Sequence, residues 1–324
     1  MIKTSPKAGL VSFESRDCSK IVQIERSLMY PETFAGVYTA LITPFDNRNQ
    51  FDRGRFAEQI SRQIAGGVTG IVPVGTTGES PTLDFDEHID VIKAAVEFAG
   101  RKVKVIAGTG GNCTKEAIFL AQSGEQAGAD ALLQVAPYYN KPSQAGLFAH
   151  FDAVAKATRL PIFLYNIPGR CGVDILVDTV CKLHEANPNI MGIKEAGGST
   201  DRVTELRLKL GKDFVILCGD DSLALPFLSV GADGVVSVVS NVVPEAVSEL
   251  VLAGAKGDFV SARAIHMKLF PFTKSLFLEG NPVGVKCAMK QLGWDRGTLR
   301  LPMFEASEET ARHIQRQLVV LKLL

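Results

Sequence analysis

The sequence of 324 residues has few of the features that mark metal-binding, secreted or membrane proteins. Its six cysteines include no C-x-x-C pair, and its five histidines form no H-x-x-x-H pair. Because zinc sites and disulfide frameworks depend on such spacings, we expect no metal site, and reduced, mostly buried thiols in a cytoplasmic protein. No run approaches the ~18 uncharged apolar residues that a membrane-spanning helix needs.

The chain also lacks an excess of either charge, since 35 Lys and Arg residues face 35 Asp and Glu residues. A protein whose main partner is nucleic acid or an anionic membrane usually carries a basic excess, so we expect neither partner. The composition, 46% hydrophobic and 22% charged, is typical of a globular protein. The length suits one α/β barrel or two smaller domains.

The polar residues 1–33 have weak periodicity, and we expect them to form a poorly ordered N-terminal extension. After them, apolar runs alternate with stretches of helical periodicity, a pattern that predicts parallel strands with helical crossovers. The eight runs span residues 37–42, 70–74, 103–107, 131–136, 161–165, 190–194, 214–218 and 234–238. Each strand–helix unit therefore averages roughly 25 residues, which is the spacing of a barrel.

We predict a (β/α)8 TIM barrel over residues 34–256, followed by a C-terminal helical region over residues 257–324. Its helices are expected at 259–278, 282–292 and 307–321. An open doubly wound sheet would need a nucleotide-binding loop after its first strand. The segment 108–113 lacks the third glycine of G-x-G-x-x-G, and no G-K-[ST] occurs, which favours the closed barrel.

One lysine stands where a buried strand should end. The run 190–194 is apolar up to Lys194, whereas strands buried on both faces usually stay apolar throughout. Lys194 is either a salt-bridged surface residue or an amine in a half-buried pocket, where desolvation favours the neutral, nucleophilic form. Barrel active sites gather at the carboxyl ends of the strands, so the other strand ends decide between these alternatives.

Those ends carry phenols, hydroxyls, a guanidinium and glycine-rich turns, but no histidine base and no cysteine nucleophile. The turn 75–78 could be a tight strand-to-helix connection or a set of backbone donors for a carboxylate. Tyr165 could be a core aromatic, with Thr76 as the partner of its phenol. Arg170 could be a solvated loop residue or a carboxylate clamp. Together these groups suit imine chemistry on a small carboxylate-bearing carbonyl compound.

Five motifs carry a family resemblance: Gly75-Thr76-Thr77-Gly78-Glu79-Ser80, Pro137-Tyr138-Tyr139-Asn140-Lys141-Pro142-Ser143-Gln144, Tyr165-Asn166-Ile167-Pro168-Gly169-Arg170, Gly192-Ile193-Lys194-Glu195-Ala196 and Gly219-Asp220-Asp221. In this order they resemble the dihydrodipicolinate synthase (4-hydroxy-tetrahydrodipicolinate synthase) family of pyruvate-dependent class I aldolases. The resemblance covers about residues 34–320. It implies a lyase that needs no cofactor and condenses pyruvate with aspartate semialdehyde in lysine and diaminopimelate biosynthesis.

The resemblance also implies a role for each matching residue. Lys194 would form the Schiff base with pyruvate, and Thr77 would hold the pyruvate carboxylate. Tyr165, Thr76 and Tyr139 would form a proton relay, with Tyr139 reaching into the neighbouring subunit's site. Arg170 would bind the carboxylate of aspartate semialdehyde. Gly219 and Val236 would line the pocket, with Val236 where the family often has isoleucine. A homotetramer built as a dimer of dimers is expected.

In family members that lysine inhibits, the effector binds at the dimer interface, away from the imine site. The matching positions, which could form an L-lysine effector site here, are Ser80, Pro81, Phe85, His88, Asn112, Glu116 and Tyr138. Phe85 departs from the histidine or tryptophan of some inhibited relatives. Its ring keeps an aromatic face for a cation but loses a hydrogen-bonding edge. The alternative is that these residues simply pack an interface.

Three other functions compete with this interpretation. A sibling lyase, such as an N-acetylneuraminate lyase or a 2-keto-3-deoxy sugar acid aldolase, would share Lys194 and Tyr165, but Arg170 and the pair Tyr138-Tyr139 favour the synthase. A phosphate-binding barrel isomerase could use the glycine-rich segment 231–234 but explains neither Lys194 nor Tyr165. A catalytically silent relative would serve for binding or regulation.

Overall fold

The computed structural model describes residues 34–324, and the expectation of an N-terminal extension over residues 1–33 falls outside the described part. Residues Phe34–Leu324 form one compact unit. Whether the chain divides functionally at residues 256 and 257 stays a prediction. Among the described residues, no helix is long and apolar enough to cross a bilayer.

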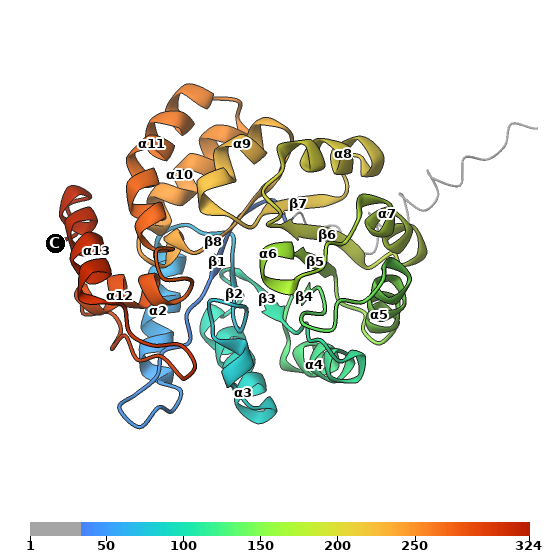
Figure 1. Cartoon of the computed structure of the whole chain (residues 1–324), viewed down its shortest axis with the longest axis horizontal. Coiled ribbons are helices and arrows are strands. Elements are labelled where there is room, and N and C mark those ends of the chain that lie inside the picture. The colour runs from blue at the N-terminus through green and yellow to red at the C-terminus, as the bar shows by residue number, and fades with distance from the viewer. Residues whose placement is uncertain (1–33) are drawn as a thin grey trace, which may run out of the picture. The chain divides into compact units, whose positions relative to one another are not determined.

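The predicted barrel is confirmed: eight parallel strands close in sequence order, each hydrogen-bonded to the next and the last to the first. Figure 1 shows these strands at the centre, with helices around them. The strands are β1 Gly36–Ala40, β2 Gly70–Val72, β3 Lys104–Gly108, β4 Ala131–Val135, β5 Ile162–Asn166, β6 Ile190–Glu195, β7 Val215–Cys218 and β8 Gly234–Ser237. Their side chains are almost all buried, as expected of parallel strands that are covered on both faces.

Closure of the barrel depends on a glycine pair. Gly36 of β1 lies opposite Gly234 of β8, and a Cβ atom on Gly234 would lie 1.9 Å from the carbonyl oxygen of Gly36. Gly36 itself has a φ of +124°, which L side chains rarely adopt. The first and last strands can therefore approach to hydrogen-bonding distance because Gly234 carries no side chain, and a Cβ atom on Gly36 would instead lie 2.0 Å from the Thr69 hydroxyl oxygen.

The helices follow the strands and begin at side-chain caps where the sequence supplies them. The barrel helices are α2 Arg53–Ala65, α3 Phe85–Ala99, α4 Thr114–Ala127, α5 Gln144–Lys156, α6 Pro168–Cys171, α7 Val177–Ala186, α8 Thr200–Leu210, α9 Ala224–Ser229 and α10 Pro244–Ala255, with short 3-10 turns η1 Ser80–Thr82, η2 Asp221–Leu223 and η3 Val239–Asn241. Asp84 caps α3 by accepting a hydrogen bond from the backbone N–H of Glu87. Ser143 and Ser199 cap α5 and α8 in the same way.

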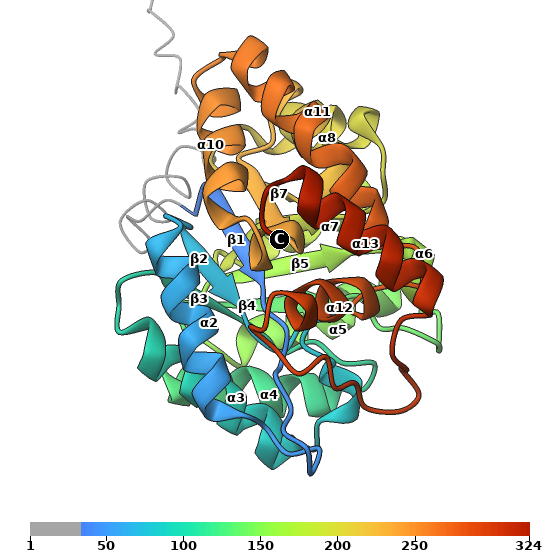
Figure 2. The same ribbon diagram turned by 90° about the vertical axis from the view of Figure 1, so that its left-hand side faces the viewer.

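The predicted C-terminal helices are confirmed as α11 Phe259–Ser275, α12 Val283–Gln291 and α13 Glu308–Val320. Helix α13 packs against α11 and α12 on one side of the barrel (Figures 1 and 2). The loop before α12 and the loop after it both return to the carboxyl end of β2, which brings the C-terminal region to the site described below.

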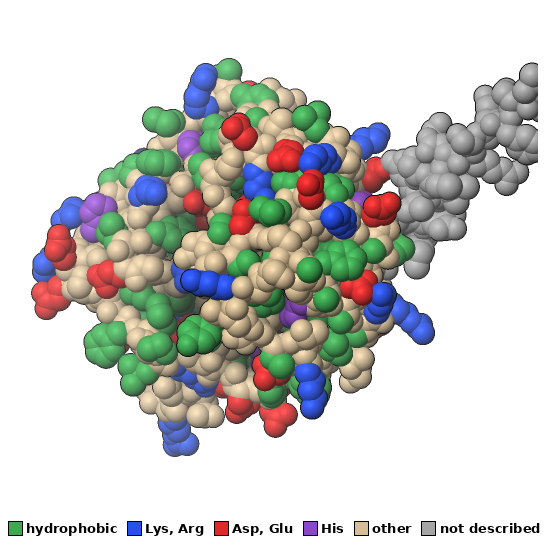
Figure 3. Space-filling view, turned by 45° about the vertical axis from the view of Figure 1, so that its right-hand side comes forward, with side chains coloured by type: hydrophobic (Ala, Val, Ile, Leu, Met, Phe, Trp, Pro, Cys, Tyr) green, Lys and Arg blue, Asp and Glu red, His purple; other side chains and the backbone are tan. Residues whose placement is uncertain are grey.

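Two details differ from the sequence-based expectations. Strand β2 ends two residues early, because Val74 has a φ of +50° and turns the chain out of the sheet. The thiols are less uniformly buried than expected: of the five described cysteines, all free, Cys171 and Cys218 are buried and Cys113 is exposed. On the surface, acidic and basic side chains are interspersed over the face drawn in Figure 3.

Candidate active site

A cavity of about 210 Å³ opens at the carboxyl ends of β2 to β5. Three of the predicted catalytic or substrate-binding residues line it: Thr76, Tyr165 and Arg170. The remaining lining residues are Val74, Gly75, Ser80, Pro81, Gly108, Gly110, Leu133, Val135, Tyr138, Ile167 and Cys171. The lining is thus mostly apolar with a few convergent polar groups, which is the usual composition of a small-molecule site.

Lys194 lies beside Tyr165, which lines the cavity, but is not itself part of the lining. They are paired in the parallel register of β5 and β6, so both side chains leave neighbouring strands at the same level. The Lys194 Nζ lies 4.1 Å from the centroid of the Tyr165 ring, and the two residues are only 7% and 4% exposed. Of the two alternatives that the sequence left open for Lys194, the structure therefore favours an amine buried in a pocket over a surface residue.

The turn after β2 is held in an unusual conformation. Val74 and Glu79, which flank Gly75-Thr76-Thr77-Gly78, have φ angles of +50° and +55°. Gly108 allows this turn to pass, since a Cβ atom there would lie 2.5 Å from the carbonyl oxygen of Val74. The Thr43 hydroxyl donates to the carbonyl of Gly78 at 2.6 Å, which fixes the far end of the turn.

The two threonines of this turn have different surroundings. Thr76 is partly exposed in the cavity, whereas Thr77 is 2% exposed and accepts a hydrogen bond from the Asn281 Nδ2 at 2.9 Å. Among the hydrogen bonds of the described residues, none joins Thr76 to Tyr165. The proton relay between them therefore stays a prediction.

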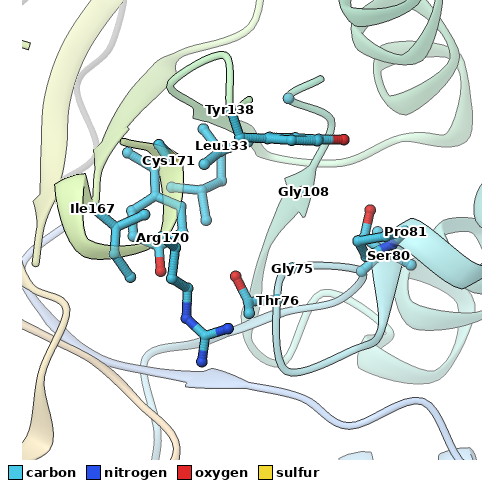
Figure 4. Close-up of a pocket in the computed structure, with 14 residues that line it drawn as sticks. Gly75, Thr76, Ser80, Pro81, Gly108, Leu133, Tyr138, Ile167, Arg170 and Cys171 are labelled. Atoms are coloured by element: carbon cyan, nitrogen blue, oxygen red, sulfur yellow. The ribbon is translucent and has the colours of Figure 1, made fainter. Parts of the chain in front are cut away.

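Arg170 enters the cavity from the single-turn helix α6. Its guanidinium extends toward the turn that carries Thr76 (Figure 4) and donates to the backbone carbonyl of Asn281 at 3.4 Å. Next to it, burial raises the pKa of the Cys171 thiol to about 11. At neutral pH this thiol is protonated, so among the lining side chains Cys171 is a poor nucleophile.

The buried carboxylate of Glu195 connects the ends of β5 and β6. Glu195, directly after Lys194, is fully buried and accepts hydrogen bonds from the Asn166 Nδ2 at 3.1 Å and from the Arg202 Nε at 2.7 Å. Asn166 directly follows Tyr165, and its Oδ1 accepts from the backbone N–H of Ile175. The ends of β5 and β6 are therefore joined by side chains as well as by backbone pairing.

Three predicted substrate-binding residues, Thr77, Gly219 and Val236, do not belong to the cavity lining; Gly219 follows β7 and Val236 lies in β8. A Cβ atom on Gly219 would lie 3.2 Å from the Cε of Lys194, so this glycine leaves room for the lysine side chain. Val236 is 2% exposed within β8. Tyr139 also lies outside the lining: it is 89% exposed and has a φ of +73°.

The predicted effector residues adjoin this cavity. Ser80, Pro81 and Tyr138 are part of its lining, and a separate effector site at a dimer interface stays a prediction. Burial and then the Glu116 carboxylate raise the pKa of the Tyr138 phenol. Asn112 donates to the backbone carbonyl of Tyr138 at 3.3 Å. His88 is buried against the carbonyl of Gly108, and Phe85 packs edge-on against Phe119.

Two residues without a sequence-based role, Asn281 and Lys286, contact the turn after β2, and Lys286 gives Glu79 of that turn a partner that the sequence does not indicate. Lys286 and Glu79 form a fully buried ion pair, 2.5 Å between Nζ and Oε1. The signals that could have indicated them are a lysine within an apolar helical stretch and an Asn-Pro pair at the start of that stretch. Neither pattern predicts a partner that lies about 200 residues away in the chain.

Comparison with known proteins gives consistent matches over the described part of the chain. The model of the "Dihydrodipicolinate synthetase family" matches residues 33–320. A 4-hydroxy-tetrahydrodipicolinate synthase of Chelativorans sp. (strain BNC1) is 48% identical over 281 residues, which are 87% of this chain and 96% of the relative.

Solved structures agree with these sequence matches. The 4-hydroxy-tetrahydrodipicolinate synthase of Methylacidiphilum fumariolicum SolV has a TM-score of 0.88 and 50% identity, over 90% of this chain and 96% of that chain. The enzyme of Cyanidioschyzon merolae, solved with lysine bound, has a TM-score of 0.88 and 38% identity, over 90% of this chain and 99% of that chain.

The contribution of the Glu195–Arg202 ion pair to the stability of the fold can be measured by urea denaturation. Glu195→Ala leaves the charge of Arg202 unpaired, and we expect it to lower the free energy of unfolding by about 3–5 kcal/mol in urea denaturation. The matched control is Asp178→Asn, whose ion pair with Lys209 is 2.8 Å long but has side chains that are 76% and 43% exposed. That control should cost less than about 1 kcal/mol. Similar small losses for both variants would show that Glu195 does not hold the strands.

Proposed function

The chain belongs to the dihydrodipicolinate synthetase family, and we propose that it is a lyase that condenses pyruvate with L-aspartate 4-semialdehyde to give 4-hydroxy-tetrahydrodipicolinate. This reaction serves lysine and diaminopimelate biosynthesis. The observation that carries the proposal is the buried Lys194 amine, 4.1 Å from the centroid of the Tyr165 ring at the carboxyl end of the barrel. A partly apolar cavity with the guanidinium of Arg170 adjoins this pair.

The proposed reaction begins with attack of the neutral Lys194 amine on the C2 carbonyl of pyruvate. Loss of water gives an imine, and loss of a proton from C3 gives an enamine. The enamine carbon attacks the aldehyde of the second substrate, whose oxygen takes up a proton. The amine of that substrate then attacks the imine carbon, closes the ring and releases Lys194. Every bond in this scheme is made by protein or substrate atoms, so no cofactor is required.

Each step of this scheme moves a proton, and the site has no histidine in its lining. We assign the transfers to the Tyr165 phenol and the Thr76 hydroxyl, which share the cavity, and to Tyr139 of a neighbouring subunit. The exposure of Tyr139 supports this last assignment, because an aromatic side chain that is 89% exposed in one chain is available to a second copy. The proposed assembly is a homotetramer made of two such dimers.

The two substrate carboxylates would bind to different groups of the site. We place the pyruvate carboxylate at the turn of Thr77, whose hydroxyl accepts from Asn281 and can still donate its own proton. We place the carboxylate of aspartate semialdehyde at Arg170, which extends into the cavity. Gly219 and Val236 would shape the space next to Lys194, and the expected compartment is the cytoplasm.

The rival functions have less support. A sibling aldolase acting on sugar acids would use the same Lys194, but the relatives reported above carry the synthase name. The glycine-rich segment 231–234, which a barrel isomerase could use to bind phosphate, leads into the start of β8. It therefore lies at the opposite end of the barrel from the cavity. The carbonyl of Gly231 in that segment is bound by the Arg207 guanidinium.

The nucleophile is tested by trapping. After borohydride treatment with pyruvate, mass spectrometry should find the reduced adduct on Lys194 alone, because this amine is the one buried beside Tyr165. Lys194→Ala should lose both the adduct and nearly all condensation activity. The exposed Lys93 on α3 provides the control, and Lys93→Ala should keep both. An adduct on a different lysine would contradict the assignment.

Substrate recognition is tested at Arg170. Arg170→Ala should raise the KM for aspartate semialdehyde by about 10- to 150-fold, since a charge-assisted contact contributes roughly 1.5–3 kcal/mol. Pyruvate trapping should stay near the wild-type level. The control Arg312→Ala removes a guanidinium on α13 that is 62% exposed. If trapping in Arg170→Ala fell as far as condensation, Arg170 would be a structural residue instead.

A role of Tyr139 in the neighbouring site predicts complementation between inactive subunits. Mixing Tyr139→Phe and Lys194→Ala subunits should restore part of the activity, because a mixed dimer can hold one site with both wild-type groups. Subunit exchange is confirmed first by native mass spectrometry of differently tagged chains. Activity that stays at the sum of the two variants would mean that each site is built within one chain.

Regulation by L-lysine is proposed from the effector residues and from the relative solved with lysine bound. We expect partial inhibition by millimolar lysine that is not competitive with pyruvate. Glu116→Ala should abolish it, because Glu116 would pair with the α-amine of the effector. Unchanged rates at tens of millimolar lysine, with no binding by calorimetry, would remove the effector site and leave the catalytic proposal standing.

A further inference from the structure

The C-terminal region contacts the turn after β2 at two points that the reaction scheme does not use. Asn281, just before α12, donates to the Thr77 hydroxyl at 2.9 Å. Lys286, on α12, pairs with Glu79 at 2.5 Å between Nζ and Oε1. The turn is thus held at its centre and at its end by residues more than 200 positions away in the sequence.

The pair of Lys286 and Glu79 is fully enclosed, with side chains that are 0% and 1% exposed. The Lys286 Nζ also donates to the carbonyl of Thr298 at 2.8 Å and lies 4.3 Å from the centroid of the Phe45 ring. The other carboxylate oxygen of Glu79 accepts from the backbone N–H of Arg300 at 3.0 Å. Each of the two charged groups therefore has more than one partner, and these partners fix the position of both side chains.

Stability alone gives a weak reason for such a pair. Burying two charges has a desolvation cost that their attraction often fails to exceed, and apolar residues of similar volume are frequently as stable or more stable. Burial indeed lowers the pKa of Lys286, and the Glu79 carboxylate opposes that effect. A function for the pair is better sought in the backbone that it holds.

That backbone is strained. Glu79 and Val74 both have left-handed φ angles, +55° and +50°, and neither is glycine. A residue other than glycine in this conformation is strained and persists only where the surrounding contacts over-determine its conformation. At Glu79 those contacts are the Lys286 ammonium and the Arg300 N–H. Without the pair, fewer contacts, such as the Thr43 hydroxyl and the backbone hydrogen bonds of the turn, oppose a relaxation of Glu79 toward an ordinary conformation.

We propose that Lys286 and Glu79 are positioning residues, which hold the Gly75–Glu79 turn in the conformation that receives the carboxylate of the keto acid. The inference rests on the proposed function, in which this turn binds pyruvate. Neither side chain touches the substrate. The pair acts through the direction of the turn's N–H groups and of the Thr77 hydroxyl, so its loss weakens pyruvate binding more than it slows the chemical steps.

The test separates positioning from stability with three variants: Glu79→Gln, Lys286→Met, and both together. Each single variant leaves one buried charge or polar group without its partner and should lower the free energy of unfolding measured in urea. The double variant should regain part of that stability, because neither member of the pair is left without the other. We expect the KM for pyruvate to rise about tenfold or more in all three, with kcat within about threefold of wild type.

The matched control is Asp233→Asn, which breaks a largely buried ion pair with Arg207 of 2.6 Å at the far end of the barrel. It should lower stability without changing the KM for pyruvate. If the double variant regained both stability and the wild-type KM, the pair would be merely structural and the inference would be overturned.

Borohydride trapping on Lys194 separates this inference from the function on which it rests. The variants should trap fully at saturating pyruvate and poorly at low pyruvate. Absence of an adduct in the wild-type protein would overturn the proposed function itself. A wild-type adduct together with unchanged pyruvate dependence in the double variant would overturn only the positioning role.

Discussion

The contact between the Lys194 amine and the face of the Tyr165 ring is the interaction on which the rest of the site depends. It exists because β5 and β6 pair in a register that sets these two residues side by side, and because the barrel holds that register by closing through the glycines of β1 and β8. Lys194 is thereby buried beside the Tyr165 ring, at the place where the proposed reaction needs a nucleophilic amine.

Two buried ion pairs to which we assign no contact with substrate lie near Lys194 and Tyr165. Glu195 with Arg202 joins the ends of β5 and β6, and Glu79 with Lys286 holds the turn after β2. Each pair is adjacent in sequence or in space to residues to which we assign a contact with substrate. The first pair holds the ends of β5 and β6, and the second holds the end of the turn after β2. The C-terminal helices are therefore part of the site, although the barrel alone supplies the residues assigned to the reaction chemistry. This arrangement agrees with the general requirement that reacting groups be held within a fraction of an ångström.

Much of this could be predicted from the sequence, because the relevant physics is local or follows from the fold class. Eight apolar runs at regular spacing indicate the barrel, and parallel strands bring Thr76, Tyr165 and Lys194 to one end without further information. The prediction failed where tertiary contacts decide. Strand β2 is short because Val74 takes a left-handed conformation, and Lys286 looks like any helical lysine until α12 packs against the turn. The exposure of Tyr139 agrees with what the family resemblance implies, but hydrophobicity alone would not predict it, since aromatic residues are usually expected to pack.

We assign the nucleophile to Lys194 and the substrate carboxylate to the turn after β2. A crystal structure of the protein soaked with pyruvate tests both assignments. We expect continuous electron density between the Lys194 Nζ and C2 of pyruvate, with the carboxylate against Thr77 and the neighbouring N–H groups. Density joined to another lysine, or pyruvate bound elsewhere beside an unmodified Lys194, would contradict these assignments.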